Sequence, residues 1–193
     1  MKNDEFEKYL NKVRNNISNL HNRFYIWRGL LNKDYNKIYN KNKYFWASVV
    51  YSLDKLIIID LSKLFEQRNE WQEKRYGKGI NLYRLMEFIE DESKKNDIEK
   101  KINEEISKIE SIKGWRDKLI AHEDEDVFLN MDSFYEEYSL KHADIEDLIE
   151  LSKKILGDIT TTVTKEGHSY TFETFRREGD LDIKTIMKKL SED

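Results

Sequence analysis

An arginine and a histidine lie close together in the segment Arg116–His122, which reads RDKLIAH and has a short apolar run between the two. The guanidinium of an arginine is always charged and binds phosphate as a planar fork. The imidazole of a histidine is the side chain best suited to move protons near neutral pH. Together these groups could cleave a phosphodiester without a metal ion, so Arg116 and His122 are the candidate catalytic residues.

The spacing of this pair has little specificity by itself, because Arg14 and His21 are separated by a similar distance along the chain. Arg14 lies in a polar, asparagine-rich stretch, whereas helical spacing places Arg116 on an apolar face with Ile112. The structural alternative for such a pair is an arginine that anchors a helix and a histidine that stabilises the helix dipole. The apolar context of Arg116 favours the functional interpretation over this alternative.

The composition predicts one helical domain over residues 1–193, since the chain has no proline and only seven glycines. The absence of cysteine excludes disulfides and thiolate metal sites, which suits a reducing cytosol. The longest purely apolar run, residues 56–59, is far too short to span a membrane. A net charge of −4 also argues against a generic basic coat for nucleic acids. We therefore expect a cytoplasmic protein without a membrane segment.

Helical periodicity predicts an all-α bundle of five to seven helices, with its core in residues 40–165. Helices in 4–40 and at 182–191 should pack on this core. The other expected elements are helices over 43–66, 80–93, 97–122 and 144–164, loops over 67–79 and 165–179, and an irregular aromatic segment over 127–143. The wide apolar arc of 43–66 makes it the expected central helix, packed beside 97–122.

Two carboxylates, Asp54 and Asp60, fall inside the apolar arc of 43–66. Buried carboxylates are rare unless they are paired. An arginine on an apolar face needs an anion for the same reason. We therefore expect at least one of the two aspartates to neutralise a buried cation, with Arg116 as the first candidate and Asp60 as a supporting residue of the site.

Other candidate sites have weaker support from the sequence. The acidic run 123–126 could form a metal cluster with His122, but there is no second histidine at ligand spacing. A solvated helix end is the better interpretation, so we expect no metal and no cofactor. The aromatic stripe 44–46 is more typical of a core or a dimer interface than of a base-stacking surface. His142 and His168 are isolated, and we expect both at the surface.

On one continuous helix, Arg116 and His122 would point about 120° apart. The two side chains could then converge only if the helix ends at the motif, or if two chains share one site. This geometry favours a two-fold homodimer with the motif at or near its interface.

The segment 114–124, which reads GWRDKLIAHED, resembles the R-(D/N)-K-x-x-A-H-x-D signature of HEPN-domain proteins. The apolar helix over 45–65 is similar to that of the AbiU-like abortive-infection branch, and the resemblance covers roughly residues 40–165. HEPN domains are helical bundles, usually homodimeric. Many are metal-independent endoribonucleases of toxin–antitoxin and phage-defence systems, in which the arginine and histidine of both subunits line one cleft.

The resemblance implies that Arg116 and His122 are the catalytic pair and that Asp117 is the polar residue that commonly follows the arginine. One position departs from the pattern. Toxins silenced by a partner nucleotidyltransferase often have a tyrosine two residues after the histidine, where this chain has Asp124. Regulation by tyrosine modification is therefore not expected.

The leading hypothesis is an endoribonuclease in a toxin–antitoxin or phage-defence setting, with RNA as substrate and an antitoxin protein as a further partner. The alternative is a catalytically silent HEPN dimer that binds a partner protein or a nucleotide. The motif favours the first hypothesis, whereas the charge balance favours the second.

Overall fold

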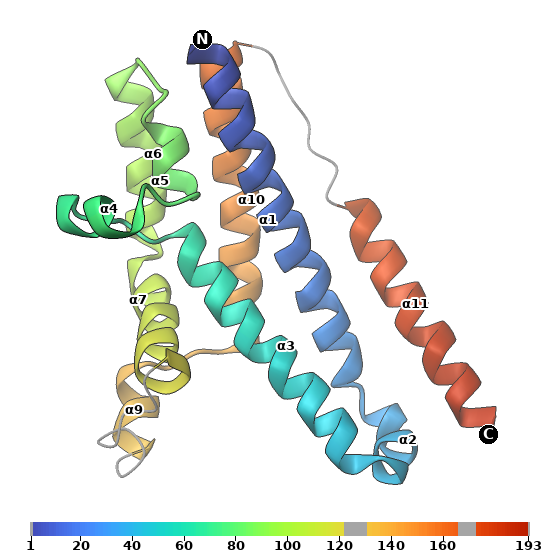
Figure 1. Ribbon diagram of the computed structural model, residues 1–193. Helices are drawn as coiled ribbons and strands as arrows, with labels where there is room; N and C mark the ends of the chain where they lie inside the picture. Colours follow the sequence, from blue (N-terminus) through green and yellow to red (C-terminus); the bar gives the residue numbers. More distant parts are fainter. Residues whose placement is uncertain (1, 122–130, 166–172, 193) are drawn as a thin grey trace. The chain divides into compact units, whose positions relative to one another are not determined.

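The computed structural model describes residues 2–121, 131–165 and 173–192, and in these ranges every regular element is helical (Figure 1). The all-α prediction is thereby confirmed. Six helices have nine or more residues, in line with the five to seven expected: α1 (Lys2–Leu30), α3 (Lys43–Leu64), α6 (Glu92–Glu104), α7 (Ile106–Gly114), α10 (His142–Thr164) and α11 (Glu173–Glu192). Four shorter ones lie between them: α2 (Asn36–Lys41), α4 (Glu70–Tyr76), α5 (Leu82–Met86) and α9 (Met131–Glu137). None of the described helices is long and apolar enough to cross a membrane.

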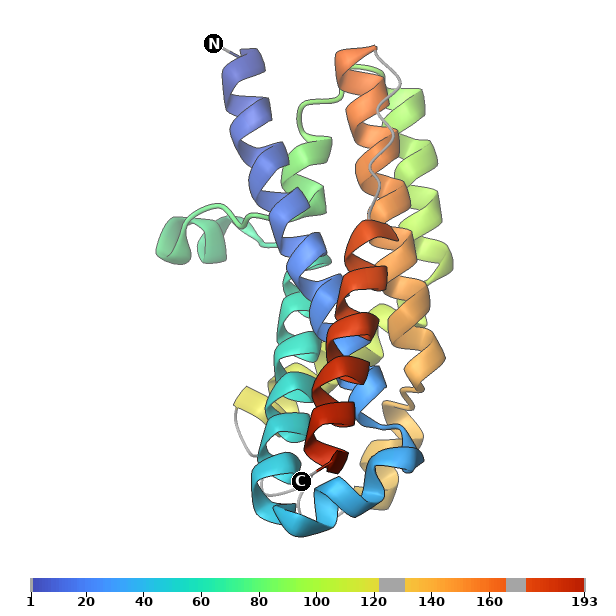
Figure 2. The same ribbon diagram turned by 90° about the vertical axis from the view of Figure 1, so that its right-hand side faces the viewer.

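The described residues fall into two compact units, one within 1–17 and 58–170 and the other within 18–57 and 171–193. Helix α10 is the centre of the first unit, where it contacts α5, α6 and α7 (Figure 2). Its buried residues recur every three or four positions: Ile145, Leu148, Ile149, Ser152, Ile155, Leu156, Ile159 and Thr160. The expectation that 43–66 is the central helix is therefore corrected for this unit, to which α3 contributes only its last turns.

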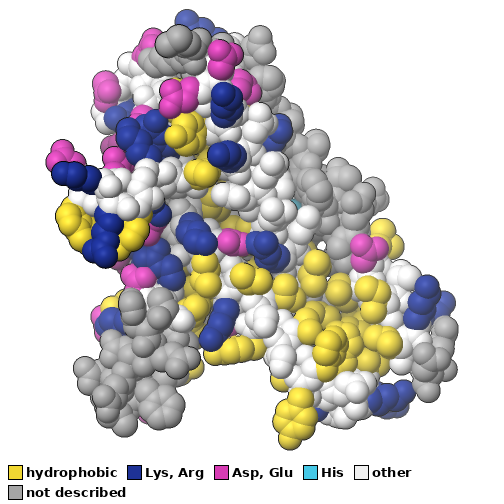
Figure 3. Space-filling model, in the orientation of Figure 1, with side chains coloured by type: hydrophobic (Ala, Val, Ile, Leu, Met, Phe, Trp, Pro, Cys, Tyr) yellow, Lys and Arg dark blue, Asp and Glu magenta, His cyan; other side chains and the backbone are white. Residues whose placement is uncertain are grey.

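The second unit has a small core of Leu30, Ile38, Ile183 and Met187, against which the half-buried residues of α3 pack. Only part of the aromatic stripe 44–46 belongs to this core. Trp46 packs there, whereas Tyr44 is 88% exposed and Phe45 is 61% exposed. Hydrophobic side chains accordingly gather on the surface over α3 (Figure 3). The role of this face as a dimer interface stays a prediction.

Local hydrogen bonds explain where two elements begin. The expected loop over 67–79 contains α4, because the Asn69 side chain accepts from the Gln72 N–H at 2.9 Å and the Gln72 side chain accepts from the Asn69 N–H at 3.0 Å. This reciprocal capping satisfies donors that a helix start leaves open. Helix α10 begins at His142 rather than at Asp144, whose carboxylate accepts from the Lys141 N–H at 2.8 Å. Asp144 therefore closes the first turn from inside the helix.

The segment 97–122 is not one helix as expected. Helix α6 ends at Glu104, and Glu105, with φ −108° and ψ 17°, leaves the helical conformation before α7 begins. Helix α7 ends in turn at Gly114 and continues as a π-helical turn over Trp115–Ala121. Glycine is required at position 114 for a steric reason, because a Cβ built there would lie 2.2 Å from the Tyr138 ring.

We expect Gly114→Ala to lower the free energy of unfolding by about 1–3 kcal/mol, since the new methyl group must displace the Tyr138 ring. Gly157→Ala is the matched control, because a Cβ at this position within α10 meets nothing within 4 Å. That substitution should raise stability by up to about 1 kcal/mol, through the better helix propensity of alanine. Urea unfolding followed by circular dichroism measures both changes in stability. Equal effects of the two substitutions would contradict the steric role of Gly114.

Candidate functional site

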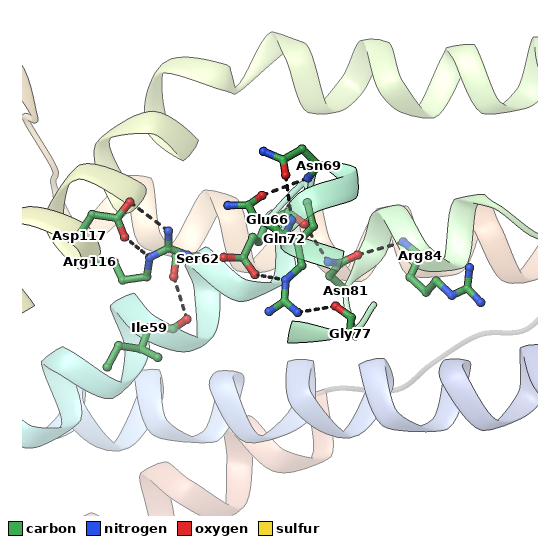
Figure 4. Close-up of polar contacts among 11 residues, drawn as sticks. Ile59, Ser62, Glu66, Asn69, Gln72, Gly77, Asn81, Arg84, Arg116 and Asp117 are labelled. Carbon is green, nitrogen blue, oxygen red and sulfur yellow. Dashed lines mark hydrogen bonds and ion pairs between the residues drawn. The ribbon is translucent and has the colours of Figure 1, made fainter. Parts of the chain in front are cut away.

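Arg116 lies on the π-helical turn and is bound by two carboxylates (Figure 4). Its Nε donates to Asp117 Oδ1 at 2.5 Å and its Nη2 donates to Asp117 Oδ2 at 3.0 Å. Its Nη1 donates to Glu66 Oε1 at 3.1 Å. The side chain keeps 21% of its surface exposed, so it is partly buried and still reachable from solvent.

Glu66 is the carboxylate partner of Arg116 that comes from a distant part of the chain. Its second carboxylate oxygen accepts from Arg68 Nε at 2.9 Å, and its backbone carbonyl accepts from Asn81 Nδ2 at 2.8 Å. Arg68 also donates through Nη1 to the Gly77 carbonyl at 2.9 Å. Glu66 is thus held on three sides, with opposite charges alternating from Asp117 to Arg68.

The carboxylate that pairs with Arg116 is therefore Glu66, which follows the end of α3, and not the expected Asp54 or Asp60. Both aspartates are half-buried, whereas their expected placement was inside the apolar arc. The supporting role of Asp60 in the site stays a prediction.

The surroundings of Arg116 favour its charged form. Its hydrogen bonds to Asp117 raise the pKa of the guanidinium, burial opposes this, and the negative charges of Asp117 and Glu66 raise the pKa further. Among the described residues, carboxylates occupy three of its five N–H donors. The other two N–H groups can donate to phosphate oxygens, which is the chemistry expected of a guanidinium fork.

The aromatic residues Phe134 and Tyr138, which follow the motif in the chain, also pack against the π-helical turn. The Trp115 indole donates to the Tyr138 carbonyl at 2.8 Å, and its ring lies 5.3 Å from that of Phe134 on α9. The Lys118 ammonium lies 4.8 Å from the centroid of the Tyr138 ring. These contacts hold the π-helical turn in place, and such turns are frequent at functional sites.

The structure brings together two of the predicted site residues, Arg116 and Asp117. His122 and Asp124, with the rest of the acidic run 123–126, lie outside the described residues, whose backbone reaches Ala121 immediately before the histidine. In the described ranges no group of histidines and carboxylates could hold a metal ion. His168 also lies outside them, whereas His142 is exposed as expected.

The competing pair from the sequence does not form a comparable site. His21 is 2% exposed and packs edge-on against the Tyr25 ring, with 4.6 Å between the ring centroids. It is a core residue of α1. Its replacement should therefore lower stability, whereas no effect on catalysis itself is expected.

Three residues of the site were not identified from the sequence: Glu66, Arg68 and Asn81. Asn81 had a recognisable signal, because an asparagine directly before an apolar helical segment is a typical N-cap. Its Oδ1 accepts from the Arg84 N–H at 2.9 Å at the start of α5. Glu66 and Arg68 had no such signal, since the role of Glu66 depends on its contact with the distant Arg116 and that of Arg68 on its contact with Glu66.

Comparison with known proteins agrees with the fold and with the motif. The chain matches the AbiU2 family of HEPN domains over residues 3–181, a longer span than the resemblance over 40–165. It therefore belongs to the AbiU2 family. No curated protein and no solved structure matches the chain.

Proposed function

We propose that this protein is a metal-independent endoribonuclease of the HEPN type, acting in a toxin–antitoxin or abortive-infection defence setting. The observation that supports this most is the environment of Arg116. A permanently charged and partly exposed guanidinium is fixed by Asp117 and Glu66 on the turn that leads directly to His122. Membership of the AbiU2 family adds the HEPN context.

In the proposed reaction, the 2′-hydroxyl of a ribose attacks the adjacent phosphorus, so a P–O2′ bond forms and the P–O5′ bond breaks. His122 takes part in moving the proton from the 2′-oxygen to the departing 5′-oxygen. Arg116 binds the non-bridging phosphate oxygens and stabilises the charge that develops on them in the transition state. The products are a 2′,3′-cyclic phosphate and a 5′-hydroxyl.

Incubation of the purified protein with total RNA, with and without a chelator, tests this proposal. We expect fragments with 2′,3′-cyclic phosphate and 5′-hydroxyl ends, formed at the same rate in both conditions. Fragments with 5′-phosphate ends, or cleavage that requires a divalent ion, would contradict the proposed mechanism.

We also expect the protein to be a two-fold homodimer with the motif at or near the interface. The reason is the family, because the chain belongs to the AbiU2 family of HEPN domains, which are usually homodimeric. Light scattering after size exclusion, at tens of micromolar protein, should give twice the mass of one chain. A monomer under these conditions would argue strongly against a site shared by two chains.

One observation favours the alternative of a silent HEPN dimer that binds a partner protein or a nucleotide. Arg116 already binds two carboxylates, and a phosphate must compete with them for the guanidinium. A wild-type protein that cleaves no RNA but binds a protein or a nucleotide would support this alternative.

A further inference from the structure

Helix α4 has an exposed aromatic cluster on its surface, formed by Trp71, Arg75 and Tyr76 and called here the α4 cluster. Trp71 is 61% exposed and Tyr76 is 62% exposed. Trp71 is also the only one of the four tryptophans to be classed as exposed, and all four lie in the described ranges. Figure 3 shows hydrophobic side chains with basic ones between them on α4. Large exposed aromatic groups next to each other are uncommon without a function.

The three side chains of the α4 cluster contact one another. The Trp71 and Tyr76 rings lie 6.2 Å apart, nearly perpendicular, and the Arg75 guanidinium lies 5.3 Å from each ring centroid. Within the described part of the chain, no carboxylate is within ion-pair distance of Arg75. Its charge is therefore held by π faces rather than neutralised, and its donors remain available to a ligand.

The backbone of α4 is fixed in spite of its exposure. Asn69 and Gln72 cap its start, and Gly77 ends it with a φ of +75°, a conformation that favours glycine. Arg68 then connects this end to the candidate site. Its Nη1 binds the Gly77 carbonyl, and its Nε binds the carboxylate that also binds Arg116. One arginine side chain thus separates the end of α4 from the partner of the candidate catalytic arginine.

We propose that the α4 cluster stacks the bases of single-stranded RNA next to the site of cleavage. This inference rests on the proposed ribonuclease function and adds the substrate class, which is unpaired rather than double-stranded RNA. Aromatic faces combined with arginine are what proteins use to bind unpaired bases without sequence preference. The bases in a duplex are stacked on one another and cannot use such a surface.

The small size of the surface favours RNA over a protein partner. A stable protein interface buries about 800 Å² on each side, from roughly 20–30 residues. The α4 cluster has two rings, with the polar residues Gln72, Glu73 and Lys74 as their neighbours. Two aromatic rings with the Arg75 guanidinium against them are sufficient for stacking bases. The exposed Lys74 can contact the phosphates.

Binding to a labelled 2′-O-methyl oligoribonucleotide tests the proposal, because the blocked 2′-oxygen prevents cleavage during the measurement. By fluorescence anisotropy, Trp71→Leu should weaken binding by roughly tenfold, since one stacking ring is lost. Trp71→Phe retains an aromatic face and should bind nearly as tightly as the wild type. A duplex of the same sequence should bind weakly to all three proteins.

Tyr51→Ala and Lys55→Ala are the matched controls, because Lys55 Nζ lies 4.4 Å over the exposed Tyr51 ring at the same spacing along a helix. Both should bind the oligonucleotide like the wild type. Circular dichroism verifies the helix content of every variant. Equal binding by Trp71→Leu and the wild type would overturn the proposal. A lower mass of Trp71→Leu in light scattering, with RNA binding unchanged, would assign the α4 cluster to a protein contact instead.

Binding and cleavage fail separately in this design. Arg116→Ala should lose cleavage and still bind the 2′-O-methyl oligonucleotide through the α4 cluster. Binding that depends on Trp71, in a wild type that cleaves no RNA, would support the stacking site and overturn the ribonuclease. If Trp71→Leu cleaves RNA with the same dependence on RNA concentration as the wild type, the ribonuclease is supported and the stacking site is overturned. A wild type that neither binds nor cleaves RNA would overturn both proposals.

Discussion

His122→Ala should reduce the rate of RNA cleavage by about a hundredfold to ten-thousandfold, the usual cost of losing one positioned acid–base group. The two histidines within the described ranges offer no evident substitute, since His21 is buried on the core side of α1 and His142 is exposed at the start of α10. Initial rates on a defined RNA, measured at saturating concentration, give this ratio. A chelator should change neither the wild-type nor the variant rate.

The matched control for this substitution is His142→Ala, because His142 is exposed and lies at the start of a different helix. That variant should cleave RNA at the wild-type rate. Wild-type cleavage by His122→Ala would show that the histidine of the motif has no catalytic role. Loss of activity in both variants, with unchanged circular dichroism, would also contradict a specific role for His122.

Arg116→Ala should be inactive to a similar degree, because removing one preorganised donor to a developing charge typically costs about a hundredfold to a thousandfold. Arg116→Lys retains the charge without the planar fork, so we expect it to recover only part of this loss. The stability cost of Arg116→Ala should not exceed about 1 kcal/mol, because Glu66 still pairs with Arg68. Unfolding curves measured alongside the rates separate the two effects.

The role of Glu66 in positioning Arg116 can be measured by a double-mutant cycle. Glu66→Gln should lower the rate roughly tenfold to a hundredfold, since a misplaced catalytic group is costly. In the Arg116→Ala background the same substitution should have no further effect. Glu87→Gln is the control, because Glu87 pairs with Arg84 and Lys78 in the same unit. Additive effects of Glu66→Gln and Arg116→Ala would contradict the positioning role.

The sequence determined the class of fold and the location of the motif. The absence of proline and the recurrence of apolar residues every three or four positions predicted helices, because these patterns act through local backbone preferences. The same periodicity placed Arg116 on an apolar face and required an anion for it. Residue types alone established these points, and the boundaries of α3 at Lys43–Leu64 closely match the expected 43–66.

The tertiary structure decided which groups meet. Glu66 lies two residues beyond the end of α3, where helical periodicity no longer applies, and it reaches Arg116 across fifty positions of sequence. The need for glycine at position 114 depends on the Tyr138 ring, another long-range contact. The exposure of the α4 cluster is decided in the same way, since packing leaves no residue of α4 fully buried. Local pattern determines which face of a helix is apolar, but packing between distant segments determines which charges pair and which rings remain open to a ligand.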